Sequence, residues 1–253
     1  MNHNLQKIVI VGNSSNLLQH ENGDIINSFD YVVRMGMCRT IGYEINVGSK
    51  TNLLCGFVND FIVPHYRENK IVFQPKIYAS NCDHLLFLEH EYDEYKEFTQ
   101  IGNLWGIGYL PISPAAAGEY YFKFFNSKQF QSFFQTKKFS ECVFFNFVKQ
   151  ALYNEYNIKK ISFYDKASRI KVFTSYNQQL VRDRMYMPSK GMYILDYVIK
   201  TFPNAEIFVT GFDGMKTKNY WRKDDTPFWV THSSSHEMLM YKKLLRTGRI
   251  QEL

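Results

Sequence analysis

Hydrophobic and polar positions alternate along this chain in blocks that predict buried strands and amphipathic helices. Short apolar runs rich in β-branched or aromatic residues predict strands at 7–11, 29–35, 71–73, 76–78 and 206–210. Apolar positions three and four residues apart predict helices at 83–99, 191–201 and 237–245. Since strands alternate with helices and the strands are almost wholly apolar, we expect an α/β fold. The expected form is a single Rossmann-like domain with a mainly parallel central sheet flanked by helices.

The segment 120–150 departs from this pattern, because it interleaves ten phenylalanines with five lysines. One interpretation is one or two amphipathic helices whose aromatic faces lie in the core. The other is a basic aromatic element that lies on a membrane surface or covers a bound acceptor. The sequence leaves both open.

The composition excludes some classes of protein. With 45% hydrophobic and 21% charged residues, the 253-residue chain has a globular composition and is not expected to be disordered. A net charge of +6 favours anionic partners such as phosphates, acidic glycans or a membrane surface. The charge is modest and scattered, so nucleic acid is not an expected partner.

Cysteine spacing and hydropathy indicate in which cellular compartment the protein is expected. The four cysteines, Cys38, Cys55, Cys82 and Cys142, form no Cys-x-x-Cys pair, so we expect reduced, partly buried thiols and no metal site. No apolar run reaches the roughly 20 residues that span a bilayer. The first predicted strand begins within ten residues of Met1, so we expect no signal peptide. We therefore expect a cytoplasmic protein, with peripheral contact to the inner membrane face as the alternative.

Two tight turns beside predicted helices are candidates for ligand binding. A strand that ends in Gly12-Asn13-Ser14-Ser15 is expected to offer free backbone amides to an anion such as a phosphate. The second turn is Pro188-Ser189-Lys190-Gly191. The first turn is neither the Gly-x-Gly-x-x-Gly fingerprint nor a Walker loop. By itself it is equally typical of an ordinary strand–turn–helix connection.

The blocks around these turns resemble a known family. Residues 10–17, 25–35 and 42–51 resemble the long donor-binding motif of the animal-type sialyltransferases, glycosyltransferase family 29. Residues 188–191 through 209–214 are similar to the short motif, 219–221 to the third motif, and 232–237 to the His-x4-Glu very short motif. The four blocks stand in the family's order over nearly the whole chain.

The resemblance implies a fold and a reaction. The fold would be a variant of the GT-A sialyltransferase fold, with one catalytic domain over 1–253. Donor-binding elements would lie in 7–55 and 186–237, and an acceptor or lid region in about 60–185. The reaction would transfer sialic acid from CMP-Neu5Ac to a hydroxyl of a galactose-containing or other glycan, a lipid-linked one included. It would invert the anomeric centre and use neither a metal nor another cofactor.

The resemblance also implies roles for single residues. The donor-binding set is Gly12, Asn13, Ser14, Ser15, Gly36, Ser189, Lys190, Gly191, Asn219, Tyr220 and Trp221. Within it, Asn13 and Ser14 would hold the donor at its phosphate. Arg34, His236 and Glu237 would support the site.

His232 is the expected catalytic base, which takes the proton of the attacking acceptor hydroxyl. A histidine suits this role because imidazole titrates near neutral pH. A nucleoside monophosphate leaving group needs hydrogen-bond donors more than a bridging metal, and no Asp-x-Asp motif is present. His236 competes for the same role. Glu237 either positions the loop or is an ordinary helix-start carboxylate.

The chain departs from the family's pattern at several positions. Asn219 stands where the third motif usually has His, and Gly36 stands where an Asn usually touches the donor. Lys190 replaces Ser or Thr, and it would either bring positive charge to the donor or lie in solvent. The cysteine pair that joins the long and short motifs in animal members is missing. These features predict a compact version without a membrane anchor, in a reducing compartment of bacterial or viral origin.

Three alternatives remain open at this point. In the first, the donor sugar is another CMP-activated 2-keto acid: Kdo, legionaminic acid or pseudaminic acid. The chain would otherwise be a non-catalytic nucleotide- or glycan-binding module, or a membrane-surface protein built around the segment 120–150.

Overall fold

The computed structural model describes part of the chain. The described residues are 5–36, 38–56, 62–65, 70–73, 82, 84–88, 158–165, 167–168, 171–172, 188–221 and 232–253, with 62–65 and 70–73 described by backbone alone. The predicted strand 76–78, the segment 120–150 and most of the expected acceptor region lie outside these residues, as does Cys142.

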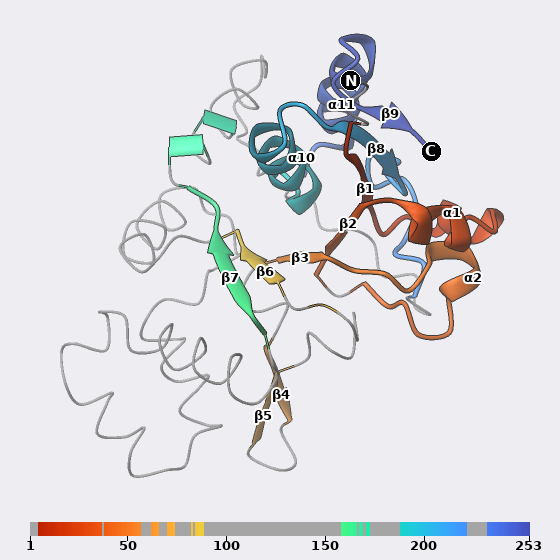
Figure 1. The fold of residues 1–253 in the computed structure, drawn as a ribbon, viewed down its shortest axis with the longest axis vertical. Helices are drawn as coiled ribbons and strands as arrows, with labels where there is room; N and C mark the ends of the chain where they lie inside the picture. The colour runs from red at the N-terminus through yellow and green to blue at the C-terminus, as the bar shows by residue number, and fades with distance from the viewer. Residues whose placement is uncertain are drawn as a thin grey trace, which may run out of the picture.

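A parallel sheet forms the centre of the molecule (Figure 1). In the described residues it has seven strands: β1 (Lys7–Val11), β2 (Tyr31–Met35), β3 (Leu53–Gly56), β6 (His84–Phe87), β7 (Lys160–Phe163), β8 (Glu206–Thr210) and β9 (Gln251–Glu252). Their order is β7-β6-β3-β2-β1-β8-β9, and every neighbouring pair is parallel. Strands β4 (Ile62–His65) and β5 (Lys70–Phe73) form a separate antiparallel pair. The expected α/β fold with a mainly parallel sheet is confirmed.

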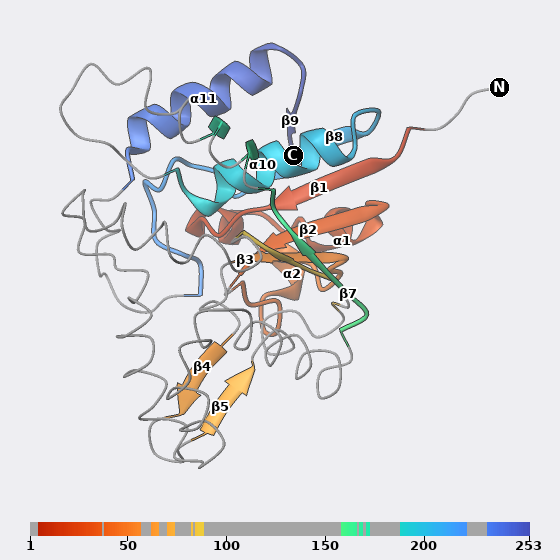
Figure 2. The ribbon, with the colours of Figure 1, turned by 90° about the vertical axis from the view of Figure 1, so that its left-hand side faces the viewer.

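Helices cover both faces of the sheet (Figure 2). The described ones are the 3-10 helix η1 (Ser15–Gln19), α1 (Gly23–Ser28), α2 (Glu44–Val47), α10 (Lys190–Thr201) and α11 (Ser234–Arg246). Side chains of α10 and α11 pack in one buried cluster, and those of η1, α1 and α2 pack in another. The two clusters therefore lie on opposite faces of the sheet.

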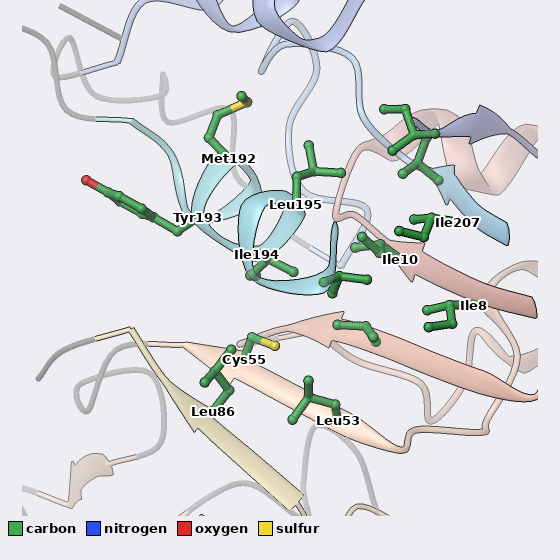
Figure 3. Packing of buried hydrophobic residues seen from close by; sticks show 14 of the residues in the cluster. Ile8, Ile10, Leu53, Cys55, Leu86, Met192, Tyr193, Ile194, Leu195 and Ile207 are labelled. Atoms are coloured by element: carbon green, nitrogen blue, oxygen red, sulfur yellow. The ribbon is translucent and has the colours of Figure 1, made fainter. Parts of the chain in front are cut away.

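The alternation of side chains along β1 explains why both faces are apolar. Ile8 and Ile10 point into the cluster with α10, where Ile194 and Leu195 lie above them (Figure 3). Val9 and Val11 belong to the other cluster. A strand covered on both sides needs apolar residues at every position, which is why 8–11 is a continuous apolar run.

The predicted helix at 83–99 is wrong at its start. Residues His84–Phe87 form β6, which pairs with β3 and β7 and is buried along its whole length. The apolar residues of this segment satisfied a helical spacing, but four consecutive buried positions are typical of an inner parallel strand. The rest of the predicted helix lies outside the described residues.

Other predicted elements are confirmed with small shifts at their ends. Strands β1, β2, β5 and β8 and helices α10 and α11 lie where the pattern predicted them. Strands β3, β4, β7 and β9 were not predicted, because each has only two to four residues and no strong alternation. In the part of the chain that the structure describes, no helix is long and apolar enough to cross a membrane.

The strand order sets where a ligand can approach. From β1 the chain builds the sheet outward through β2, β3, β6 and β7, and then returns to the other side of β1 as β8. Ligands of open α/β sheets bind outside the carboxyl ends of the strands where the order reverses in this way. In this chain that position lies between the ends of β1 and β8.

Candidate functional site

The turns that follow β1 and β8 are in direct contact at this position. The amide of Gly12 donates to the carbonyl of Thr210 at 2.7 Å, and the amide of Ser14 donates to Gly211 at 3.2 Å. A Cβ atom at Gly12 would lie 2.2 Å from the carbonyl oxygen of Gly211. Only glycine at position 12 allows the two turns to come this close.

The polar groups of the first turn are largely used within the protein. The amide of Ser15 donates to the carbonyl of Lys218 at 2.9 Å, and that of Asn16 donates to Oγ of Ser14 at 3.1 Å. With the bonds from Gly12 and Ser14, the backbone amides of four residues in and directly after this turn have hydrogen-bond partners within the protein. The expectation that this turn offers free backbone amides to an anion is therefore wrong for these residues.

Asp213 joins the two turns through its carboxylate. Its Oδ2 accepts from Oγ of Ser14 at 3.0 Å, and from the amide and Oγ1 of Thr217 at 2.9 and 2.6 Å. Oγ of Ser14 and Oγ1 of Thr217 lie 2.9 Å apart, and the latter also accepts from the amide of Ser15 at 3.1 Å. Ser14 is almost fully buried. Its hydroxyl donates a hydrogen bond to Asp213 or Thr217, so this proton is not available to a ligand.

The third-motif block lies against the same turn. The amide of Tyr220 donates to the carbonyl of Asn13 at 2.9 Å, and Asn219 pairs with Ser14 in an isolated antiparallel bridge. Residues more than 200 positions apart in sequence are therefore neighbours, as the donor-binding prediction requires.

Tyr220 and Trp221 have different surroundings. Tyr220 is buried, its hydroxyl donates to the carbonyl of Arg39, and its ring packs edge-on against Tyr43. Burial raises the pKa of Tyr220. Trp221 is partly exposed, and the Arg39 guanidinium lies 6.0 Å from its ring centroid. Of the two, Trp221 is the better placed to line an open site.

Two buried polar atoms near this turn have no hydrogen-bond partner. They are Oδ1 of Asn13 and Nε1 of Trp221, for which the described residues offer no partner. Buried polar atoms in native proteins nearly always have a partner, and exceptions are typical of binding sites. One hydrogen-bond acceptor, Oδ1 of Asn13, and one hydrogen-bond donor, Nε1 of Trp221, therefore remain beside the β1 turn for a ligand or water.

On the other side of the site, Ser189 and Glu237 join α10 to α11. The carboxylate of Glu237 accepts from the amide of Ser189 at 2.5 Å and from its hydroxyl at 2.6 Å. Ser189 occupies the N-cap position of α10, but its side chain makes no cap hydrogen bond. Burial raises the pKa of Glu237 to about 7, although both bonds from Ser189 act in the opposite direction. Of the two roles left open for Glu237, the geometry supports positioning of the loop.

Phe212 connects the two halves. A Cβ at Gly191 would lie 2.9 Å from its ring, and a Cβ at Gly12 would lie 3.2 Å from it. Both glycines thus leave room for one aromatic ring that stands between the β1 turn and the start of α10.

Arg34 is a buried structural residue. Its Nε donates to the carbonyl of Lys50 and to Oγ1 of Thr51, and its Nη2 donates to the carbonyls of Val47 and Gly48. It is fully buried, and burial lowers its pKa. Arg34 holds the loop that leads from α2 into the amino end of β3.

The remaining predicted residues lie around the edge of the sheet where the parallel strands have their carboxyl ends. Gly36 is buried directly after β2, and its amide donates to the carbonyl of Cys55 at 2.5 Å. Lys190 is the first residue of α10. His232 is partly exposed two residues before α11, and His236 is buried in the first turn of that helix. Since Glu237 of this turn contacts Ser189, the His232 segment lies near the start of α10.

A pocket of about 170 Å³ lies between the joined turns and η1. Its lining includes Ser14, Asn16, Gly211 and Asp213. Neither Ser189 nor His232 is among the described lining residues. The hollow therefore belongs to the β1–β8 half of the site.

Possible metal ligands and the state of the cysteines can be read from the described residues. No group of three or more His, Cys, Asp or Glu side chains within the described ranges could hold a metal ion. Cys38, Cys55 and Cys82 are buried thiols, as expected, and burial raises the pKa of Cys38 to about 11.

The sequence analysis missed two residues of the site. Asp213 lies inside the block that resembles the short motif. A single carboxylate there matches no catalytic or binding pattern, so the sequence did not indicate a role for it. Thr217 lies in the loop after it, and no spacing marks it. Only the fold brings both to Ser14.

Comparisons with known proteins agree with this arrangement. The family model of glycosyltransferase family 29 (sialyltransferase) matches residues 1–94. The chain is 52% identical over 46 residues to a CMP-N-acetylneuraminate-beta-galactosamide-alpha-2,3-sialyltransferase 1 of Gallus gallus, and 44% identical over 46 residues to that of Mus musculus. It is 41% identical over 54 residues to the beta-1,6-galactosyltransferase GALT29A of Arabidopsis thaliana.

These sequence matches are short. They cover 18% of this chain for the first two relatives and 21% for the third, but only 14% and 13% of the relatives' own length. The chain thus matches about a seventh of each of these relatives.

The fold is similar over nearly the whole chain to the crystal structure of a mammalian sialyltransferase. The TM-score is 0.51 at 19% sequence identity, over 98% of this chain and 69% of the other. The same values hold for that enzyme in complex with Gal-beta-1-3GalNAc-ortho-nitrophenol. This likeness supports the α/β Rossmann-like fold of the sialyltransferases.

Proposed function

We propose that this chain is a member of glycosyltransferase family 29 and transfers sialic acid from a CMP-activated donor to a glycan hydroxyl, supported by its N-terminal match to the family model and by its fold. The observation that carries the proposal is the meeting of three predicted blocks at the carboxyl ends of β1 and β8. There the turn Gly12–Ser15, the turn at Ser189 and the block 219–221 come together through direct contacts or through Phe212. This is where an open α/β sheet binds its ligand.

The relatives suggest the two substrates. The names of the two animal relatives contain CMP-N-acetylneuraminate as donor and beta-galactosamide as acceptor. A galactose-terminated disaccharide is bound in one similar structure. We therefore infer a galactose-containing acceptor for this chain.

The proposed mechanism is a single displacement with inversion, in which His232 is the general base. A neutral imidazole would take the proton of the acceptor hydroxyl as it attacks the anomeric carbon. His232 is partly exposed beside the start of α11, whereas His236 is buried in its first turn. This difference in exposure supports His232 over His236 as the residue that meets an acceptor. The departing CMP would be stabilised by hydrogen-bond donors and not by a metal.

At the β1 turn the proposed donor contact narrows to Asn13. The amides around it and the Ser14 hydroxyl have internal partners, whereas Oδ1 of Asn13 has none among the described residues. Trp221, with its indole N–H also without a partner, is the second proposed contact.

The test compares wild type with His232→Ala and His236→Ala in a reaction with CMP-Neu5Ac and a galactose-terminated acceptor. CMP release and product mass are both measured. We expect His232→Ala to lose transfer by about 100-fold or more while CMP binding is retained. His236→Ala is the matched control, and a larger loss there would make His236 the base. A wild-type protein that binds no CMP would contradict the proposal.

A different donor sugar is the second candidate. The substitutions at Gly36, Lys190 and Asn219 change three predicted donor contacts, and one relative is named a galactosyltransferase. A donor panel of CMP-Kdo, CMP-legionaminic acid, CMP-pseudaminic acid and UDP-galactose separates these possibilities. The cytoplasmic location and the bacterial or viral origin stay predictions; the sequence relatives are from chicken, mouse and Arabidopsis.

A further inference from the structure

A carboxylate in the turn proposed to receive an anionic donor needs an explanation, because a negative charge repels a phosphate. Oδ2 of Asp213 accepts three hydrogen bonds, two from Thr217 and one from Ser14. These donors offset its charge and occupy the oxygen. Through Oδ2, Asp213 is therefore arranged as an acceptor of hydrogen bonds from within the protein.

The bonds of this network define the shape of the β1 turn. Ser14 bonds to Asp213 and also accepts from the amide of Asn16, which begins η1. Oγ1 of Thr217 accepts from the amide of Ser15. The backbone on the C-terminal side of Asn13 thus depends on two side chains from the loop after β8.

We propose that Asp213 is a positioning residue of the donor site, which acts through Ser14 and Thr217 to hold Asn13 toward the donor. This inference rests on the proposed function. It also changes the role of Ser14 from a donor contact to a member of the positioning network.

Two pairs of variants test the inference. Asp213→Ala removes the acceptor, whereas Asp213→Asn keeps a neutral oxygen that still accepts. Thr217→Val removes the hydroxyl at nearly constant shape, whereas Thr217→Ser keeps it. Tyr164→Phe is the control: its hydroxyl donates to Asp196 of α10 at 2.5 Å, in a hydrogen bond that involves neither the β1 turn nor the loop after β8.

The first readout is steady-state kinetics with CMP-Neu5Ac and a galactose-terminated acceptor. We expect Asp213→Ala to raise the donor KM by about 10-fold and Thr217→Val by about 5-fold, in line with one or more lost hydrogen bonds. The kcat at saturating donor and the acceptor KM should stay within about 3-fold. Asp213→Asn, Thr217→Ser and Tyr164→Phe should stay close to wild type in donor KM.

The second readout is hydrogen exchange of the Asn16 amide, which does not require activity. It should be about 10-fold faster in Asp213→Ala and Thr217→Val, because the acceptor Ser14 is released, and unchanged in Tyr164→Phe. Wild-type protein without transfer or CMP binding would contradict the proposed function, while the exchange rates would still decide whether Asp213 orders the turn.

Two results would overturn the inference. A rise of the donor KM in Asp213→Asn equal to that in Asp213→Ala would mean that the charge, and not the hydrogen bonds, is needed. An unchanged donor KM together with an unchanged Asn16 exchange rate in Asp213→Ala would mean that the network does not position the turn.

Discussion

The β1–β8 turns and the α10–α11 junction form two halves of one site, and they are held together in different ways. The turns are joined mainly by backbone hydrogen bonds, with Gly12 packed against Gly211. The junction is joined by the buried carboxylate of Glu237, which accepts both donors of Ser189.

The two kinds of joint respond to different changes. Backbone amides do not titrate near neutral pH, and the contact at Gly12 has no room for a side chain. Glu237 has its pKa raised to about 7 by burial. We therefore expect the turns to be sensitive to added volume, and the junction to be sensitive to pH and to loss of one acceptor.

The largest effect is expected from Gly12→Ala. Its Cβ would lie 2.2 Å from the carbonyl oxygen of Gly211, so β1 and β8 would have to separate. Overpacking of this kind costs about 3 kcal/mol or more. Urea denaturation measures the loss in free energy of unfolding.

Gly248→Ala is the matched control for this change. Gly248 has φ +66°, and no heavy atom lies within 4 Å of a Cβ built there. Its cost is the conformational strain alone, about 1 kcal/mol. Equal losses in the two variants would contradict the close-packed description of the turns.

A medium effect is expected from Glu237→Ala. The amide and hydroxyl of Ser189 would lose their acceptor, at a cost of about 1–3 kcal/mol, and donor affinity should fall because the start of α10 loosens. Calorimetric titration with CMP and thermal unfolding measure the two effects. Glu252→Ala is the control, since Glu252 accepts one bond from Tyr241 at 3.2 Å in an exposed position. CMP affinity that falls equally in both variants would not fit the proposed positioning.

The smallest effect, counted per pH unit, comes from the titration of Glu237. The folded protein keeps a proton on Glu237 up to about pH 7, whereas the unfolded chain loses it near 4.5. Between these values the folded state binds more protons, so its stability from this group is present below pH 4.5 and falls as pH rises to 7. Each pH unit in this interval changes the free energy of unfolding by up to about 1.4 kcal/mol.

Glu237→Gln removes this slope. In denaturation curves at pH 5, 6, 7 and 8, the free energy of unfolding of wild type should fall relative to that of the variant as the pH rises to 7, since only wild type loses stability to this group. Parallel pH profiles would show that Glu237 titrates at its ordinary value.

Much of the fold was predictable because it depends on local pattern. The apolar run at β1 and the spacing of buried residues in α10 are visible in the sequence. The pattern at His84–Phe87 predicted a helix because the three apolar residues after His84 satisfy either structure. Burial on both faces decided the outcome, and it depends on β3 and β7, which are distant in sequence.

The sequence predicted blocks that lie side by side in the structure, but not the hydrogen bonds that their side chains make. The predicted blocks at Gly12–Ser15 and 219–221 meet as expected. The sequence could not indicate that Ser14 is bonded to Asp213, since the two are 199 positions apart. It also could not decide between two roles for Glu237, because only the packing of α11 on α10 brings the carboxylate to Ser189.

By itself, the sequence determined the α/β class, the two glycine turns and the order of the motif blocks, because these depend on residues that are near each other in the chain. The tertiary structure decided which polar groups have internal partners and which remain for a ligand. Hydrogen-bond partners and burial depend on distances between remote segments. For that reason Ser14 and Asn13, adjacent in sequence, have different surroundings at the ends of β1 and β8.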